Sequence, residues 1–130
     1  TISRMELMGE FLSNLNYELD GCLAWFVITQ DMMNRANATK ADVEGFSDMV
    51  RTISGVEVAL MIFEQNQSSC RINFRSKGKY RVNDIAKSLG GGGHAFAAGA
   101  IVSGSLSDVK QMAVQASISS LNSKMIGSSE

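Results

Sequence analysis

The chain has few of the side chains that build a hydrolytic metal centre. Its 130 residues include one histidine, His94, and two cysteines, Cys22 and Cys70, and its carboxylates are scattered along the sequence. A binuclear centre needs clustered His and Asp ligands. We therefore expect no metal site and no catalytic residue for metal-assisted hydrolysis in this chain. Both cysteines lie in apolar, strand-like segments, which predicts small buried hydrophobes rather than a disulfide or metal ligands.

Net charge and long apolar runs are also scarce. A formal net charge of -1 and a pI ≈ 5.8 disfavour a broad basic groove for nucleic acid but are compatible with a local phosphate pocket. The sequence has no signal peptide and no apolar run near the roughly 20 residues of a membrane span, which predicts a cytoplasmic protein without membrane contact. Proline is absent too, but its absence excludes no class of fold.

The length and the apolar patterns indicate one α/β domain. A chain of 130 residues, of which 45% are hydrophobic, can bury a core without cross-links. Helical spacing predicts helices at 3–17, 39–53, 82–89 and 107–125, and residues 29–35 form a short helix or a turn. Apolar runs or alternation predict strands at 22–29, 56–64, 69–76 and 100–104. The second and third strands form a hairpin around a polar turn. This order predicts a mixed sheet of at least four strands with covering helices, and a glycine-rich loop between a helix and the last strand.

The first predicted helix carries a broad apolar stripe. Its residues are Met5, Leu7, Met8, Phe11, Leu12 and Leu15. Such a stripe is a packing face. Its partner is this domain, a missing domain or a second copy of the chain, so a homodimer is among the alternatives that the sequence leaves open. The chain begins with this helix and no strand, as we expect of a piece of a longer protein.

The run of four glycines from Gly90 to Gly93 is the clearest functional signal. Ordering glycine is costly, so a folded protein keeps such a run where its backbone closely approaches a ligand or takes positive φ. His94 and the alanine-rich segment 95–98 follow, and alanine predicts a helix start there. A glycine loop that leads into a helix start presents free backbone N–H groups, which is the outline of an anion site.

The alternative for the glycine run is a slack linker. The predicted helix 82–89 ends where Gly90 would cap it, and the strand 100–104 follows. The loop is thus held between two ordered elements, which favours a site. It is not a Walker motif, since no Lys-Ser or Lys-Thr follows, and not the dinucleotide fingerprint, because Ala95 stands where the third glycine should be.

Positive side chains lie along the strand 69–76. Arg71, Asn73 and Arg75 point to one side in the predicted alternation, and this side is either solvated or faces an anion. On this strand alone the solvated alternative is favoured. One short helix separates Arg75 and Ser76 from the loop 90–94, so a pocket between them would offer a guanidinium, a hydroxyl, backbone donors and an imidazole. These donors suit phosphate.

Three segments resemble a known family. They are Asn73-Phe-Arg-Ser76, Val82-Asn-Asp-Ile85 and Gly90-Gly-Gly-Gly-His-Ala-Phe-Ala-Ala-Gly-Ala100. They are similar to the C-terminal DHH-associated domain of DHH phosphoesterases, in the branch of nanoRNases, pAp-phosphatases and exopolyphosphatase-related proteins. The resemblance extends from Trp25 to Ser103, and the Gly-Gly-Gly-His motif is its most specific part.

The resemblance implies a division of labour between two domains. An N-terminal DHH domain, absent from this chain, would hold the divalent metals, usually Mn2+, and cut the phosphoester. Residues 21–126 would be the DHH-associated domain that binds a phosphate-bearing substrate, and residues 1–20 would be a linker or interdomain helix. The chain would then be part of a hydrolase, and we expect it to bind substrate without cutting it.

The resemblance also implies which residues bind the substrate phosphate. They are Arg75, Ser76, Gly91, Gly92, Gly93 and His94. The first two would hold a phosphate or the nucleotide end, and the glycine motif would act near the metals. Asn73 stands where family members often have serine, so its own role is open.

Several substrates and functions fit these expectations. Short oligoribonucleotides, 3′-phosphoadenosine 5′-phosphate, cyclic-dinucleotide products and polyphosphate all carry terminal phosphates. A free-standing nucleotide- or anion-binding regulatory module is the alternative function. An appendage like that of alanyl-tRNA-editing proteins shares the glycine motif but fits Arg75 and Ser76 less well.

Overall fold

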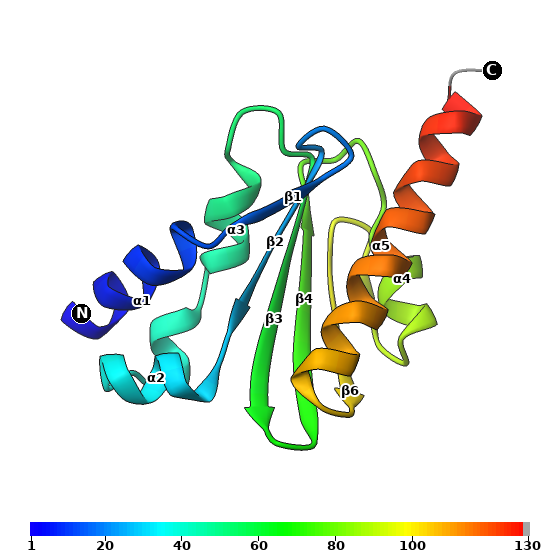
Figure 1. The fold of residues 1–130 in the computed structure, drawn as a ribbon. Helices are drawn as coiled ribbons and strands as arrows, with labels where there is room; N and C mark the ends of the chain where they lie inside the picture. Colours follow the sequence, from blue (N-terminus) through cyan, green and yellow to red (C-terminus); the bar gives the residue numbers. More distant parts are fainter. Residues whose placement is uncertain (129–130) are drawn as a thin grey trace.

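A computed structural model describes residues 1–128, which form a mixed sheet with helices on both faces (Figure 1). The sheet has six strands in the order β1-β2-β3-β4-β6-β5. The strands are β1 (Asn16–Glu18), β2 (Leu23–Ile28), β3 (Val58–Asn66), β4 (Ser69–Ser76), β5 (Gly92–His94) and β6 (Ala97–Ser103). The helices are α1 (Ile2–Leu12), α2 (Gln30–Ala36), the 3-10 helix η1 (Lys40–Val43), α3 (Phe46–Arg51), α4 (Asn83–Ser88) and α5 (Leu106–Ser128). The predicted α/β domain on a mixed sheet is confirmed.

Two apolar cores lie on the two faces of the sheet. α4 and α5 cover one face, where Ile72 and Phe74 of β4 are fully buried. α1, α2 and α3 gather on the other side of the sheet (Figure 1). There Phe11 lies between Phe26 and Phe46, with ring centroids 4.4 and 4.6 Å apart. These rings come from α1, β2 and α3, so their contacts fix the helices against the sheet.

Helices cover the second face only in part. Side chains alternate along β4, so its apolar residues enter the first core while Arg71, Asn73 and Arg75 lie on the second face. On the same face β6 presents small residues and Ile101, whose side chain is 65% exposed. The second core therefore lies over β2 and β3, and the area over β4, β6 and β5 stays open.

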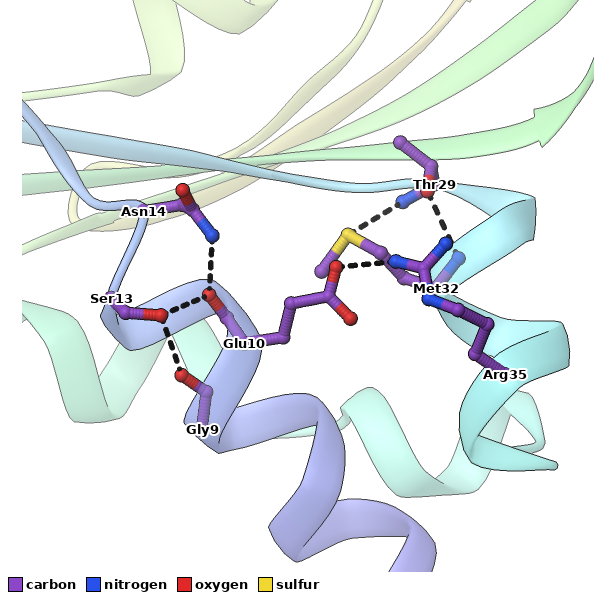
Figure 2. A network of polar contacts seen from close by, with 7 residues as sticks. All are labelled: Gly9, Glu10, Ser13, Asn14, Thr29, Met32 and Arg35. Carbon is purple, nitrogen blue, oxygen red and sulfur yellow. Dashed lines mark hydrogen bonds and ion pairs between the residues drawn. The ribbon is translucent and has the colours of Figure 1, made fainter.

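The first helix is shorter than its apolar stripe predicts. α1 ends at Leu12, and the chain turns into β1 instead of continuing to residue 17. Ser13 Oγ donates to the carbonyl oxygen of Gly9 at 2.9 Å, and Asn14 Nδ2 donates to that of Glu10 at 2.8 Å (Figure 2). Polar side chains thus satisfy carbonyls of the last turn and allow the chain to leave the helix.

Figure 2 also shows how α1 meets α2. Arg35 Nη2 lies 2.5 Å from Glu10 Oε2, and the Thr29 hydroxyl caps α2 by accepting the Met32 N–H at 3.0 Å. An ion pair between such exposed side chains contributes only about 0–1 kcal/mol. The apolar core between the helices and the sheet therefore dominates. Among residues 1–128, no helix is both long enough and apolar enough to cross a membrane.

The predicted helix 39–53 consists of two elements, η1 and α3. They separate at Gly45, whose φ of 82° is left-handed and interrupts the helix. Arg4 of α1 holds this break, since its Nη1 donates to the carbonyl oxygens of Asp42 at 2.8 Å and Glu44 at 2.7 Å. Its guanidinium also lies 4.6 Å from the ring centroid of Phe46. α1 thereby fixes the position of residues 40–45.

Asp42 fixes the same segment through its carboxylate. It accepts hydrogen bonds from the Thr1 hydroxyl at 2.5 Å and from the Thr39 N–H at 2.9 Å. These bonds favour the charged carboxylate, so the Thr1 hydroxyl and then the Thr39 N–H lower the pKa of Asp42 below its ordinary value. The turn that precedes α3 is therefore well anchored.

The alanine-rich segment after the glycines is a strand and not a helix. Gly92 pairs with Gly99 and His94 with Ala97, so β5 and β6 form an antiparallel hairpin. The prediction of a helix start after Gly93 is wrong, because pairing of β6 with β4 overrides the helical propensity of alanine. The last strand accordingly begins at Ala97 and not at residue 100.

We predict different effects of alanine at two adjacent glycines. A Cβ on Gly91 would lie 2.1 Å from the carbonyl oxygen of Gly99 and 2.6 Å from Ala100 Cα, whereas a Cβ on Gly92 would meet nothing within 4 Å. Gly91→Ala should lower the free energy of unfolding by about 1–3 kcal/mol, and Gly92→Ala should change it by less than about 0.5 kcal/mol. Urea denaturation measures both values, and equal values would contradict the close approach of β5 to β6.

Candidate functional site

A groove occupies the part of the second face that the helices leave open. Its volume is about 670 Å³. β4 contributes Arg71, Asn73 and Arg75, and the remaining lining comes from residues 90–94 and 97–101. The predicted residues Arg75, Gly91, Gly92, Gly93 and His94 are therefore brought together, across β6, in one open groove.

Three consecutive glycines of the motif line the groove, and the fold requires only two of them to be glycine. Gly91 has no room for a Cβ, as described above, and Gly93 combines a φ of 144° with a position where a Cβ would lie 2.7 Å from Ala98 Cα. Gly92 has neither restriction. The fold therefore explains Gly91 and Gly93, whereas the exposed backbone of Gly92 leaves space for a ligand.

Arg75 is held at the wall of the groove. Its side chain is 26% exposed, and its Nε lies 3.5 Å from Asp48 Oδ1. Its Nη1 donates to the carbonyl oxygen of Phe74 at 2.9 Å. Asp48 also pairs with Arg51 at 3.2 Å. Because two guanidiniums share one carboxylate, the cluster keeps a net positive charge beside the groove.

His94 ends β5 on the other side of the groove. Its side chain is exposed and lines the groove. Among residues 1–128, no hydrogen bond or ion pair involves its imidazole. The imidazole is therefore available to a ligand.

Ser76 lies apart from the other predicted site residues. It is 1% exposed and belongs to the opposite face of β4, because neighbouring residues in a strand point to opposite sides. Its hydroxyl accepts the Gly78 N–H at 3.1 Å, and its carbonyl oxygen accepts Arg51 Nη1 at 3.0 Å. Ser76 thus shapes the turn after β4 and places Arg51, and it does not line the groove.

A second, smaller cavity adjoins the groove. It has a volume of about 110 Å³ and shares Arg71 and Asn73 with the groove. Its other lining residues come from η1, the turn after it and β3: Lys40, Val43, Glu44, Met61, Phe63 and Gln65. Sequence reasoning missed this cavity because the break at Gly45 was not predicted. The alternation of β3 and its pairing with β4 would have placed Met61 and Phe63 beside Asn73 and Arg71.

Metal-ligating side chains do not cluster in the described part of the chain. Within residues 1–128, no group of three or more His, Cys, Asp or Glu side chains is arranged to hold one. The polar groups of the groove are guanidinium, imidazole, amide and backbone groups, which suit an anion. The divalent metals implied by the resemblance do not fit the residues present here.

Curated relatives share most of this chain but are much longer. The chain is 31% identical over 102 residues to the "Bifunctional oligoribonuclease and PAP phosphatase NrnA" of Thermus thermophilus, a match that covers 78% of this chain and 30% of that protein. It is 33% identical over 87 residues to the protein of the same name from Mycoplasma genitalium, covering 67% of this chain and 27% of that protein. The chain therefore spans less than a third of these relatives.

Solved structures show the same arrangement of elements. An exopolyphosphatase-related protein from Bacteroides fragilis superimposes with a TM-score of 0.82 at 30% identity, covering 89% of this chain and 34% of that one. The C-Ala domain of alanyl-tRNA synthetase from Aquifex aeolicus superimposes with a TM-score of 0.55 at 16% identity, covering 77% of this chain and 92% of that one. The second likeness is one of fold alone.

A family match covers nearly all of the sheet and its helices. Residues 23–123 match the DHHA1 domain, from the start of β2 into α5. This range contains both the groove and the smaller cavity. It also agrees with the resemblance to DHH-associated domains carried by the Gly-Gly-Gly-His motif. The chain belongs to the DHHA1 domain family.

Proposed function

We propose that this chain is the substrate-binding domain of a DHH-type phosphoesterase and that the groove holds a phosphate of a nucleotide substrate. The observation that carries the proposal is Gly92, an exposed glycine that the fold does not require and that lines the same open groove as Arg75 and His94. A backbone without side chain, a guanidinium and an imidazole together suit the oxygens of a phosphate. The names of the NrnA relatives, oligoribonuclease and PAP phosphatase, support a nucleotide as substrate.

Arg75 would orient the phosphate as well as attract it. Its contacts with Asp48 and with the carbonyl oxygen of Phe74 restrain the guanidinium before a ligand arrives. A restrained planar fork loses less conformational entropy when it binds two phosphate oxygens. The remaining charge of the Arg75, Arg51 and Asp48 cluster favours an anion over a neutral ligand.

Cleavage of the phosphoester belongs, in this proposal, to a separate N-terminal DHH domain that holds Mn2+. The groove would present the phosphate to that domain, in a cytoplasmic enzyme. α1 would form the linker or the contact to it, since Ile2 is 80% exposed and Met5 57% exposed while Leu7 and Phe11 are buried in this domain. This chain alone would bind the substrate and not hydrolyse it.

The experiment that tests the proposed function is Gly92→Ala. A methyl group at this position should hinder the approach of a phosphate and lower the affinity for adenosine 5′-monophosphate by about tenfold. The thermal unfolding midpoint should stay unchanged, because the Cβ meets no protein atom within 4 Å. Calorimetric titration and thermal unfolding of the same preparation measure both effects. Unchanged affinity would leave Gly92 without a role in binding.

Arg75→Lys should weaken binding although the charge is kept. Lysine cannot form the planar two-pronged contact, so we expect an affinity for adenosine 5′-monophosphate about tenfold lower. Arg81→Lys is the matched control, because Arg81 is exposed and lines neither cavity. Equal affinity of the Arg75→Lys and wild-type chains would reduce Arg75 to a partner of Asp48.

His94→Ala separates a role in binding from a role in folding. The imidazole is exposed, so its removal should leave the unfolding midpoint within the error of the measurement. Loss of a hydrogen bond to a charged phosphate should lower the affinity for adenosine 5′-monophosphate by about tenfold or more. A lower midpoint with intact affinity would instead make His94 a structural residue.

A further inference from the structure

β4 carries a second arginine on the side of the groove, and this arginine is free. Arg71 precedes Arg75 by four residues on the same face of the strand, and both line the groove. With a rise of about 3.4 Å per residue, their Cα atoms lie about 14 Å apart. Within residues 1–128 no hydrogen bond or ion pair involves the Arg71 side chain, in contrast to Arg75. Arg71 is thus an exposed cation at the far end of the groove.

The smaller cavity adjoins the groove at Arg71 and Asn73, which line both. Lys40 and Glu44 line this cavity together with Arg71 and Asn73. Two cations and one carboxylate leave a net positive charge there. The charge lies four residues along β4 from Arg75, whose own guanidinium is held by Asp48 and the carbonyl oxygen of Phe74. A second anionic group therefore suits this end.

The floor of the smaller cavity is apolar. Val43, Met61 and Phe63 line it and are nearly buried, with 7%, 3% and 4% of their surfaces exposed. Met61 lies opposite Asn73 and Phe63 opposite Arg71 in the β3–β4 pairing, so the apolar floor begins directly beside the polar wall of the groove. Sugar and base rings gain from such a surface, whereas a chain of phosphates does not.

The wall of this cavity is preformed. Lys40, Val43 and Glu44 belong to the segment that Arg4 holds by its hydrogen bonds to the carbonyl oxygens of Asp42 and Glu44. A ligand therefore finds the wall in place and does not have to order it.

We propose that Arg71 and Lys40 form a second phosphate subsite and that the adjoining apolar cavity receives a nucleoside of the same ligand. The ligand class is a short single-stranded oligonucleotide whose phosphates contact both ends of the groove. This inference rests on the proposed function, which places the first phosphate at Arg75, Gly92 and His94. The second subsite makes affinity depend on the length of the ligand, and Arg71 determines that dependence.

The test compares ligands of increasing length on the full 130-residue chain. Adenosine 5′-monophosphate and 5′-phosphorylated adenosine di- and trinucleotides are titrated into wild-type, Arg71→Gln and Arg81→Gln chains, and binding is followed by amide NMR. Arg71→Gln should leave the affinity for the monophosphate unchanged and lower that for the trinucleotide by about tenfold. The slope of log affinity against log salt should fall by about 0.7 for the one lost phosphate contact. Arg81→Gln should change neither quantity.

Each outcome decides the inference. If Arg71→Gln binds all three ligands as the wild type does, the second subsite is absent while the proposed function stands. If the wild type does not bind the monophosphate, the proposed function fails and this inference fails with it. Tripolyphosphate that binds as tightly as the trinucleotide would overturn the nucleoside cavity. Lys40→Gln, an exposed position on η1, should repeat the length-dependent loss, and an unchanged unfolding midpoint in both variants excludes a folding defect.

Discussion

The alternation of side chains along β4 is the constraint on which both the core and the groove depend. β4 lies between β3 and β6, and one of its faces places Ile72 and Phe74 in a fully buried core. The other face places Arg71, Asn73 and Arg75 in the groove. A slip of one residue would exchange the two sets, which the core does not allow. The packing of one face therefore fixes the position of every polar side chain on the other.

The fold requires some glycines of the motif and not others. Gly91 and Gly93 bring β5 against β6 at distances that no side chain permits, and this approach places Gly92 and His94 at the rim of the groove. Sequence reasoning identified the motif but explained it by a helix that is not there. β5 is an edge strand, which exposes both N–H and C=O groups and has no helix dipole, so the positive charge of the groove comes from the arginines of β4.

Much of the fold could be predicted because β2 and β3 are nearly continuous apolar runs and β4 alternates between apolar and polar residues. The break between η1 and α3 was missed because its environment comes from a distant part of the chain. The apolar residues on both sides of Gly45 follow one helical pattern, but Gly45 breaks the helix. Arg4 stabilises that break from a segment about 40 residues away. Ser76 could have been placed correctly, since a residue next to Arg75 in a strand must face the other way. The cavity beside Arg71 was missed because one of its walls is η1 and the turn after it, which Arg4 holds from a distant part of the sequence.

The open half of the second face follows from the handedness of two connections. β2 and β3 are parallel, and their connection through α2, η1 and α3 covers one face. β4 runs opposite to β3. The connection from β4 to β5 through α4 crosses the sheet in the same direction as the connection from β2 to β3. Because such crossovers are right-handed, reversing the strand direction moves the second connection to the opposite face. Chain topology alone thus leaves β4, β6 and β5 without a covering helix on the side where the arginines lie, before any ligand is considered.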